Sequence, residues 1–315
     1  MPSAPMLVDV DTGIDDAIAL AYLVARGTDI RAVTTVAGNV PIDVATENTL
    51  RVLDLLGASD IPVHRGASRP LVAPYQDAVH VHGGNGLGGA QLPGSRKGEQ
   101  ALAGPAAIIA AAAEHAGDLD ILTLGPLTNL AIAINVRPEV IGQVRRVTVM
   151  GGAFAVKGNV TPHAEFNIYV DPDAANQVFN AGFRDIAAVG LDITHQTVLS
   201  RELWRSIPEG AGGGAGLVRD VLRRTFVDRD MTGAYMHDPL AAAVALDPSL
   251  ATGDTCGVTV DRDGERRGRT VPAGGDTGVT VYRAVVASRF QRDLSESLGL
   301  PPDDSDDRLE LERVE

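Results

Sequence analysis

Short runs of apolar and β-branched residues alternate along the chain with longer segments whose apolar positions recur at helical spacing. This alternation is typical of an α/β protein in which helices cover a mostly parallel central sheet. The apolar runs predict strands at 6–10, 30–36, 119–124, 146–150 and 186–191. The helical patterns predict helices at 15–26, 43–56, 105–115, 127–135 and 172–181.

The C-terminal part of the chain departs from this pattern. The region from about 251 to 285 predicts a small amount of added β structure, and the acidic residues from 301 to 315 predict a solvated tail. Neither an internal repeat nor a linker divides the chain, so we predict a single large domain that spans residues 1–315.

Two glycine-rich segments interrupt the regular pattern. The first, 74–94, also carries His80 and His82, and its glycines predict a long functional loop. The second is a flexible hinge at 209–216 that leads into a mobile helix ending near Asp228. We expect either segment, 74–94 or 205–230, to act as a lid that excludes water from a site. The alternative for each is a plain surface insertion.

Polar residues or sharp turns follow nearly every predicted strand. In open α/β sheets the ligand crevice lies outside the carboxyl ends of the strands, so we expect these turns to meet at one site. The turns are Asp11-Thr12-Gly13, Gly38-Asn39, Gly125-Pro126, Gly151-Gly152 and Asp192.

The first of these turns lies in a cluster of four aspartates, Asp9, Asp11, Asp15 and Asp16. Carboxylates this close repel one another and stay ionised only beside a positive charge. Hard oxygen ligands without a thiol or a nearby imidazole favour calcium or magnesium over zinc. The alternative for Asp15 and Asp16 is that they cap the following helix.

Composition excludes several classes of partner. The chain of 315 residues has 44% hydrophobic residues, 22% charged residues and a net charge of −14. This charge argues against nucleic acid and anionic membranes as partners. The single cysteine, Cys256, fits a reducing compartment, and neither a leader pattern nor a long apolar stretch is evident. We therefore predict a cytoplasmic protein.

Two further motifs carry side chains that can bind a metal ion, transfer a proton or bind hydroxyl groups. In His237-Asp238-Pro239, Asp238 can serve as a helix N-cap or as another metal ligand. His237, with an ordinary pKa near 6.5, suits proton transfer to a leaving group. Asn159, Glu165 and Asn167 suit a polyhydroxylated ligand or, alternatively, structural hydrogen bonds. A glycine-rich phosphate loop is missing from the sequence.

Taken in order, these motifs resemble the nucleoside hydrolase family, the inosine-uridine preferring nucleoside N-ribohydrolases. The resemblance covers about residues 6–300 and implies a Rossmann-like nucleoside hydrolase fold. The motifs that carry it are Asp9-Val-Asp-Thr-Gly-Ile-Asp-Asp16, Gly38-Asn39, Gly125-Pro-Leu-Thr-Asn129, Glu165-Phe-Asn167 and His237-Asp-Pro239.

The resemblance implies a Ca²⁺ ion held by Asp11, Asp16, Asp238 and the backbone carbonyl of Leu124. It implies that Asp11 also accepts a proton from a metal-bound water and that His237 is the acid for the leaving base. Residues implied to bind the ribose hydroxyls are Asp15, Asn39, Met150 through its main chain, Asn159, Glu165 and Asn167.

The implied reaction is hydrolysis of the N-glycosidic bond by direct attack of that water on an oxocarbenium-like sugar. For the base end, the sequence offers Phe226, Arg229 and Tyr235 as contacts, with Phe226 equally suited to the core, and His82 as a further partner. The substrate is then a small nucleoside, and the resemblance suggests a homodimer or homotetramer.

Two other functions fit parts of the sequence. A non-catalytic nucleoside- or ribose-binding protein would keep the same pocket, but binding alone needs neither Asp11 as a base nor His237 as an acid. A metal-dependent phosphatase is suggested by Asp9-Val10-Asp11 after the first strand, but an obvious cationic partner for phosphate is missing near this motif.

Overall fold

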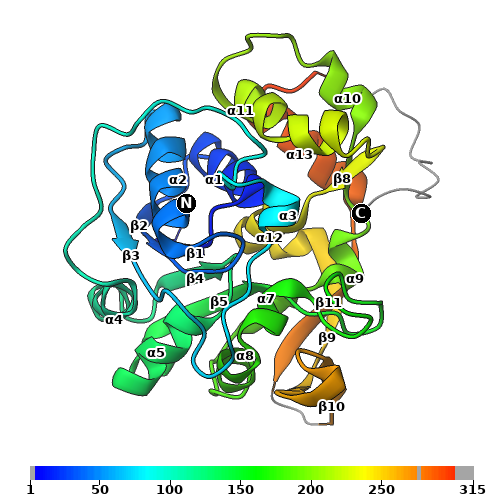
Figure 1. Ribbon diagram of the computed structural model, residues 1–315. Helices are drawn as coiled ribbons and strands as arrows, with labels where there is room; N and C mark the ends of the chain where they lie inside the picture. The colour runs from blue at the N-terminus through cyan, green and yellow to red at the C-terminus, as the bar shows by residue number, and fades with distance from the viewer. Residues whose placement is uncertain (1–3, 275–277, 302–315) are drawn as a thin grey trace.

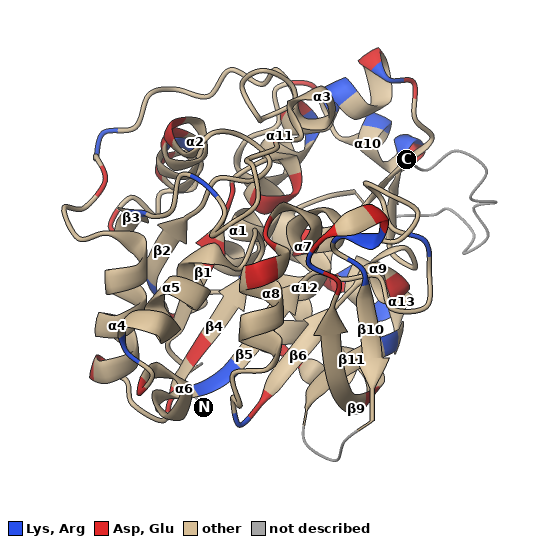
Figure 2. Cartoon of the chain, turned by 60° about the horizontal axis from the view of Figure 1, so that its bottom comes forward, with Lys and Arg blue, Asp and Glu red and all other residues tan. Residues whose placement is uncertain are grey.

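The computed structural model describes residues 4–274 and 278–301, and a nine-stranded sheet forms its centre. The strand order is β10-β9-β11-β6-β5-β4-β1-β2-β3, and Figures 1 and 2 show these strands side by side across the molecule. The strands are β1 (Met6–Val10), β2 (Ile30–Thr35), β3 (Val63–Arg65), β4 (Leu119–Thr123), β5 (Val144–Met150), β6 (Ile186–Val189), β9 (Ala251–Val260), β10 (Thr270–Ala273) and β11 (Val279–Val285). A separate antiparallel pair joins β7 (Val198–Ser200) to β8 (Gly233–Tyr235).

Helices cover both faces of the sheet (Figure 1). The longer ones are α1 (Ile14–Ala25), α2 (Ile42–Leu55), α4 (Gly104–Glu114), α5 (Thr128–Val136), α8 (Pro172–Phe179), α11 (Gly213–Val221), α12 (His237–Leu246) and α13 (Ala287–Leu298). Shorter ones are α3 (Val79–His82), α6 (Val140–Gln143), α7 (Phe166–Val170), α9 (Leu191–Thr194) and α10 (Arg201–Ser206), with a π-helical turn η1 (Arg224–Asp228) and 3₁₀ turns η2 (Pro248–Leu250) and η3 (Gly264–Arg266).

Strand β1 shows why the sequence folds this way. Its side chains alternate between the two faces, as in any strand. Met6 and Val8 join a core with α1, α11, α12 and α13, whereas Leu7 joins a second core with α4, α5 and α8. Because both faces are covered, every residue of β1 is buried, which is typical of parallel strands.

The predicted α/β architecture with a mostly parallel sheet is confirmed. Strands β3, β2, β1, β4, β5, β6 and β11 are parallel neighbours, and each predicted strand and helix lies within a few residues of an observed one. The added β structure at 251–285 extends this sheet, since β9 pairs antiparallel with both β10 and β11. The predicted acidic tail lies outside the described residues, apart from Pro301.

Three local predictions need correction. The short strand β3 was missed because its three residues include the polar His64 and Arg65. Segment 74–94 contains the helical turn α3. The glycine-rich hinge 209–216 is not wholly irregular, because α11 begins at Gly213 and packs against α1 and α13.

Within the described ranges, every helix is too short or too polar to cross a membrane.

Candidate functional site

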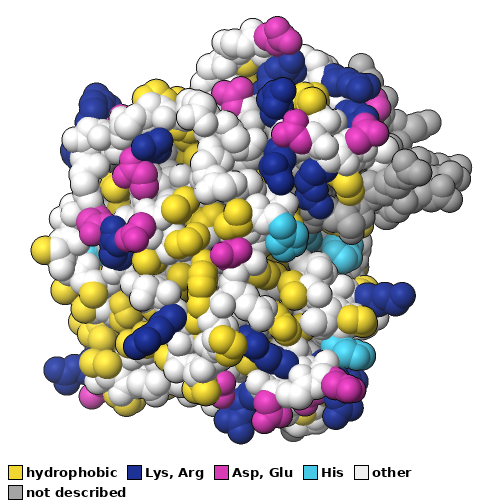
Figure 3. Space-filling model, in the orientation of Figure 1, with side chains coloured by type: hydrophobic (Ala, Val, Ile, Leu, Met, Phe, Trp, Pro, Cys, Tyr) yellow, Lys and Arg dark blue, Asp and Glu magenta, His cyan; other side chains and the backbone are white. Residues whose placement is uncertain are grey.

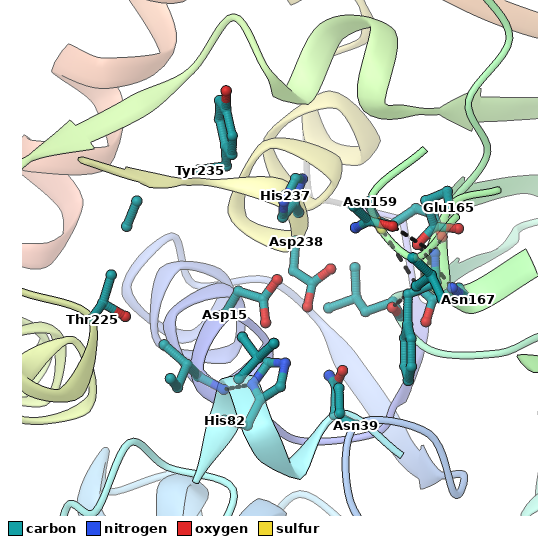
Figure 4. Close-up of a pocket in the computed structure, with 18 of the residues that line it drawn as sticks. Asp15, Asn39, His82, Asn159, Glu165, Asn167, Thr225, Tyr235, His237 and Asp238 are labelled. Carbon is teal, nitrogen blue, oxygen red and sulfur yellow. Dashed lines mark hydrogen bonds between the residues drawn. The ribbon is translucent and has the colours of Figure 1, made fainter. Parts of the chain in front are cut away.

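A cavity of about 340 Å³ opens at the carboxyl ends of the central strands. Figure 4 shows Asp15 and Asp238 with their carboxylates directed toward each other, and Glu165, Asn159 and Asn167 grouped to their right. Its lining includes the predicted residues Asp15, Asn39, His82, Leu124, Met150, Asn159, Glu165, Asn167, His237 and Asp238. The structure therefore brings these segments together, and Asp11 and Asp16 lie buried beside them.

Asp9 faces away from this cavity. Its carboxylate accepts hydrogen bonds from the Thr34 hydroxyl and from Asn129 Nδ2, the latter at 2.8 Å. Burial raises the pKa of Asp9 to about 7, although both hydrogen bonds oppose the shift. Asn129 also binds the Thr35 carbonyl, so Asp9 belongs to a network that joins the strands rather than to the cavity.

Asp16 closes the turn between β1 and α1. Its carboxylate accepts the backbone N–H groups of Asp11 (3.1 Å) and Gly13 (2.8 Å), and the Nδ2 of Asn39 (3.1 Å). Asp15 and Asp16 occupy the first turn of α1, where free N–H groups and the helix dipole favour negative charge. Capping is thus part of the role of Asp16, and its carboxylate still reaches the acidic cluster.

Asp11 lies in a cradle made by two glycine turns. Its Oδ2 accepts the backbone N–H of Asn39 at 2.6 Å, whereas Oδ1 is buried without a hydrogen-bond partner in the described part of the chain. A Cβ at Gly38 would lie 2.0 Å from Asp11 Oδ2, and one at Gly125 would lie 2.9 Å from Oδ1. Burial and the neighbouring Asp16 raise the pKa of Asp11 well above its ordinary value.

Asp238 completes the acidic cluster from the other end of the chain. Oxygen atoms of Asp15, Asp16 and Asp238 all lie within 4.8 Å of one another. Burial, followed by repulsion from Asp15 and Asp16, raises the pKa of Asp238 well above its ordinary value. Asp238 is not the N-cap of α12, because Met236 occupies that position.

This donor set can hold a metal ion. Asp15, Asp16 and Asp238 offer oxygen atoms alone, and Asp11 beside them adds a buried Oδ1 without a hydrogen-bond partner in the described part of the chain. The carboxylates lose their mutual repulsion only when a cation or protons join them. The grouping differs in one respect from the predicted ligand set, since its three carboxylates are those of Asp15, Asp16 and Asp238, without Asp11.

Asn167 connects the ends of two central strands. Its Nδ2 donates to the Leu124 carbonyl at 2.7 Å and to the Met150 carbonyl at 3.3 Å. Met150 is the last residue of β5 and Leu124 directly follows β4, so Asn167 connects the cavity floor to the ends of both strands.

Glu165 and Asn159 shape the wall formed by α7. Glu165 is the N-cap of α7 and accepts the backbone N–H groups of Asn167, Ile168 and Gly152 at 2.8–3.1 Å. Asn159 Oδ1 accepts the Phe166 N–H at 3.0 Å. Both side chains therefore make the structural bonds considered as an alternative, while they also line the cavity.

His237 differs from the sequence-based expectation of an ordinary pKa. Burial and the nearby His195 lower the pKa of His237 to about 3, so the imidazole is neutral at neutral pH. Its Nδ1 lies 2.7 Å from the Thr194 hydroxyl. Neither Thr194 nor His195 lies in a sequence motif that indicates chemistry; they are the last residue and the C-cap of the short helix α9.

His82 lies against the beginning of α1. Its Nδ1 accepts the Ile14 N–H at 3.0 Å, a bond drawn in Figure 4. A Cβ at Gly13 would lie 2.4 Å from this nitrogen, so the glycine in the first turn lets α3 approach. His82 thus joins segment 74–94 to the aspartate turn.

At the other end of the cavity, Thr225 and Tyr235 lie apart from the carboxylates (Figure 4). Tyr235 stacks on His195 with ring centroids 4.3 Å apart. Phe226 is buried against Trp204, with centroids 5.2 Å apart, so the prediction of Phe226 as a base contact is wrong and its core alternative holds. Arg229 does not appear in the cavity lining, whereas Thr225, which the sequence did not single out, does.

Comparison with known proteins identifies the family in which these cavity residues occur together. A model of the inosine-uridine preferring nucleoside hydrolase family matches residues 6–292. A non-specific ribonucleoside hydrolase, RihC, from Klebsiella pneumoniae is 37% identical over 308 residues, which cover 95% of this chain and 99% of that protein. An uncharacterised protein from Schizosaccharomyces pombe is 38% identical over 94% of this chain and 99% of its own length.

Solved structures give the same answer for the fold. A plant nucleoside hydrolase, PpNRh1, has a TM-score of 0.89 and 33% identity, covering 95% of this chain and all of that one. A purine-preferring ribonucleoside hydrolase from Gardnerella vaginalis has a TM-score of 0.85 and 30% identity, covering 93% and 98%. The resemblance inferred from the motifs is confirmed, and the chain belongs to the inosine-uridine preferring nucleoside hydrolase family.

Proposed function

We propose that this enzyme hydrolyses the N-glycosidic bond of ribonucleosides to ribose and free base, using Ca²⁺ at the acidic cluster. The observation that carries this proposal is the convergence of Asp15, Asp16 and Asp238 at the cavity, beside the partnerless Oδ1 of Asp11. The names of two relatives, a non-specific and a purine-preferring ribonucleoside hydrolase, support the substrate class.

Asp11, Asp16, Asp238 and the Leu124 carbonyl would hold the ion. Calcium accepts six to eight oxygen ligands with flexible geometry, so it also leaves room for Asp15, water and sugar hydroxyls. When bound, it would orient the water and the ribose hydroxyls and make the water more acidic.

The surrounding residues then have separate tasks. Asp11 accepts the proton of the attacking water through its partnerless oxygen. Positive charge develops on the sugar in the transition state, and the nearby carboxylates stabilise it. Water attacks the anomeric carbon directly, which predicts inversion of configuration. The ribose hydroxyls are bound by Asp15, Asn39, Asn159, Glu165, Asn167 and the main chain near Met150.

Departure of the base depends on His237. When the Thr194 hydroxyl donates to Nδ1, the other ring nitrogen of the neutral imidazole carries the proton and donates it toward the base. His82, fixed by Ile14, is a second polar group near the cavity. A neutral donor is a weaker acid than imidazolium, so we expect the base itself to influence the rate.

The alternatives fit the cavity less well. Besides a metal ion, a phosphate group is usually bound by Lys or Arg side chains, yet neither is among the described residues that line the cavity. A protein that only binds nucleosides would need neither Asp11 as a proton acceptor nor His237 as a proton donor, yet His237 lines the cavity and Asp11 lies buried beside it.

A substrate panel tests the proposal. Release of reducing sugar from inosine, uridine, cytidine and adenosine is measured with and without a calcium chelator. We expect release from at least one nucleoside, loss on chelation and recovery with added Ca²⁺. Failure to release sugar from any of the four would refute the hydrolase function, whereas full activity in chelator would refute only the role of the ion.

A further inference from the structure

Two neighbouring segments form adjacent walls of the cavity, and one arginine joins them. His80 and Val81 of α3 contribute to one wall, and Leu222 and Thr225 to the other. Arg224 donates from Nε to the Val81 carbonyl and from Nη2 to the His80 carbonyl, each at 3.2 Å. A single side chain thus binds two consecutive carbonyls of the adjoining wall.

The π-helical turn η1 places Arg224 for this role. The Arg229 N–H donates to the Arg224 carbonyl at 2.9 Å, five residues back, which is the π-helical pattern. Within this turn, Thr225 lies at the cavity while the neighbouring Arg224 crosses to α3. Isolated π turns are often found at functional sites.

Backbone packing couples the same two segments. A Cβ at Gly88, which has φ +62°, would lie 2.1 Å from the Val221 carbonyl oxygen. Gly83, with φ +80°, packs near Arg224 Cδ. Because the backbones touch at Gly88 and the guanidinium bridges the gap nearby, a displacement of one wall must displace the other.

The α3 turn is held from its other side as well. His82 accepts the Ile14 N–H at the start of α1, next to the aspartate turn. Thus α3 lies between the start of α1, near the carboxylate cluster, and Arg224, next to the wall that contains Leu222 and Thr225. On the face drawn in Figure 3, histidine side chains reach the surface just below a group of basic side chains.

We propose that Arg224 is a positioning residue that fixes the width of the nucleobase end of the cavity by holding its two walls together. The proposal rests on the proposed function, because the sugar occupies the end that carries the carboxylates. Arg224 therefore governs affinity for the base portion of the substrate and leaves recognition of ribose unchanged.

The neighbouring Arg223 provides a matched control. It carries the same charge, is exposed, and pairs at 3.5 Å with Asp228 inside its own turn. Lysine at 224 provides a second control, because it keeps the charge but lacks the planar fork that can bind two carbonyls at once.

Kinetics with Arg224→Ala, Arg224→Lys and Arg223→Ala test the proposal. For Arg224→Ala we expect KM for uridine and inosine to rise on the order of tenfold or more, with kcat reduced less, since loss of orientation weakens productive binding. The inhibition constant of free ribose should stay within about twofold. Arg224→Lys should resemble Arg224→Ala, and Arg223→Ala should resemble the wild type. The proposal would be overturned if Arg224→Ala changed the KM and the inhibition constant of free ribose equally. It would also be overturned if Arg224→Lys had the KM of the wild type.

Hydrogen exchange separates this proposal from the proposed function, because it requires no turnover. We expect faster amide exchange in both 79–90 and 221–229 for Arg224→Ala, but not for Arg223→Ala. Faster exchange confined to 221–229 would overturn the coupling of the walls. If the wild type hydrolyses no nucleoside but the exchange result holds, the proposed function fails and the structural coupling stands.

Discussion

The two ends of the cavity are built in different ways. The end with the carboxylates is assembled from the carboxyl end of the buried strand β1 and the first turns of α1 and α12, and Asp11, Asp16 and Asp238 are at most 2% exposed. The other end is assembled from short elements, namely α3, η1 and β8, and includes Tyr235, Thr225 and apolar side chains. Rigid strands position chemical groups precisely, whereas loops vary without cost to the core. We infer that the central sheet, with α1 and α12, determines the reaction and that the short elements determine which base is accepted.

The strongest test of this contrast compares two aspartates on the same segment. Asp11→Ala should lower kcat by about 10²–10⁴-fold or more, because it removes both a proton acceptor and an ion ligand. Asp9→Asn should lower kcat by less than about tenfold, since Asp9 bonds Thr34 and Asn129 away from the cavity. Steady-state kinetics on one nucleoside measure both.

Similar activities of Asp11→Ala and Asp9→Asn would contradict the different roles assigned to these two aspartates. In particular, Asp11→Ala retaining activity within about tenfold of the wild type would remove Asp11 from the role of base. Circular dichroism of each variant provides the control for folding.

A second test concerns the acidic cluster. Saturating Ca²⁺, at about a hundred times its Kd, should stabilise chelator-treated protein by about 2.7 kcal/mol, because the ion offsets repulsion among Asp15, Asp16 and Asp238. Asp238→Asn should lose most of this effect, while Asp118→Asn on the surface should keep it. Thermal unfolding with and without Ca²⁺ measures the shift, and an equal shift in Asp238→Asn would argue for an ion bound elsewhere.

The smallest expected effect lies at the base end. Tyr235→Ala should raise KM for nucleosides by roughly tenfold, in line with the 1–3 kcal/mol typical of a stacking aromatic, and should leave ribose inhibition unchanged. Tyr235→Phe keeps the ring stacked on His195 and should have little effect. A change in ribose inhibition for Tyr235→Ala would show that the two ends are not independent.

The sequence predicts those parts of the cavity that depend on neighbouring residues in the chain or on the topology of parallel sheets. The strand-to-helix turn at Asp11-Thr12-Gly13 follows from a buried strand, a glycine and two acidic residues in the first turn of a helix. The order of parallel strands then brings Asn39, Leu124 and Met150 to the same edge. These features depend on neighbours in sequence or on a general rule of topology.

Other features were beyond such rules. The low pKa of His237 depends on burial and on His195, and the role of Asn129 depends on contacts with Asp9, Thr35 and Ala67. The bond from Arg224 to α3 joins residues far apart in the chain and begins in a π turn that has no simple sequence signature. The oligomeric state and cytoplasmic location stay predictions.

Calorimetric titration of Ca²⁺ into chelator-treated protein, with activity measured over the same concentrations, is the decisive measurement of whether the ion and Asp11 act together. We expect one ion per chain and a return of ribonucleoside hydrolysis with the same midpoint as binding. We also expect that Asp11→Ala binds the ion more weakly, whereas Asp9→Asn binds it as the wild type does. Hydrolysis that persists without bound ion, or Ca²⁺ binding that Asp11→Ala leaves unchanged, would contradict this joint role of the ion and Asp11.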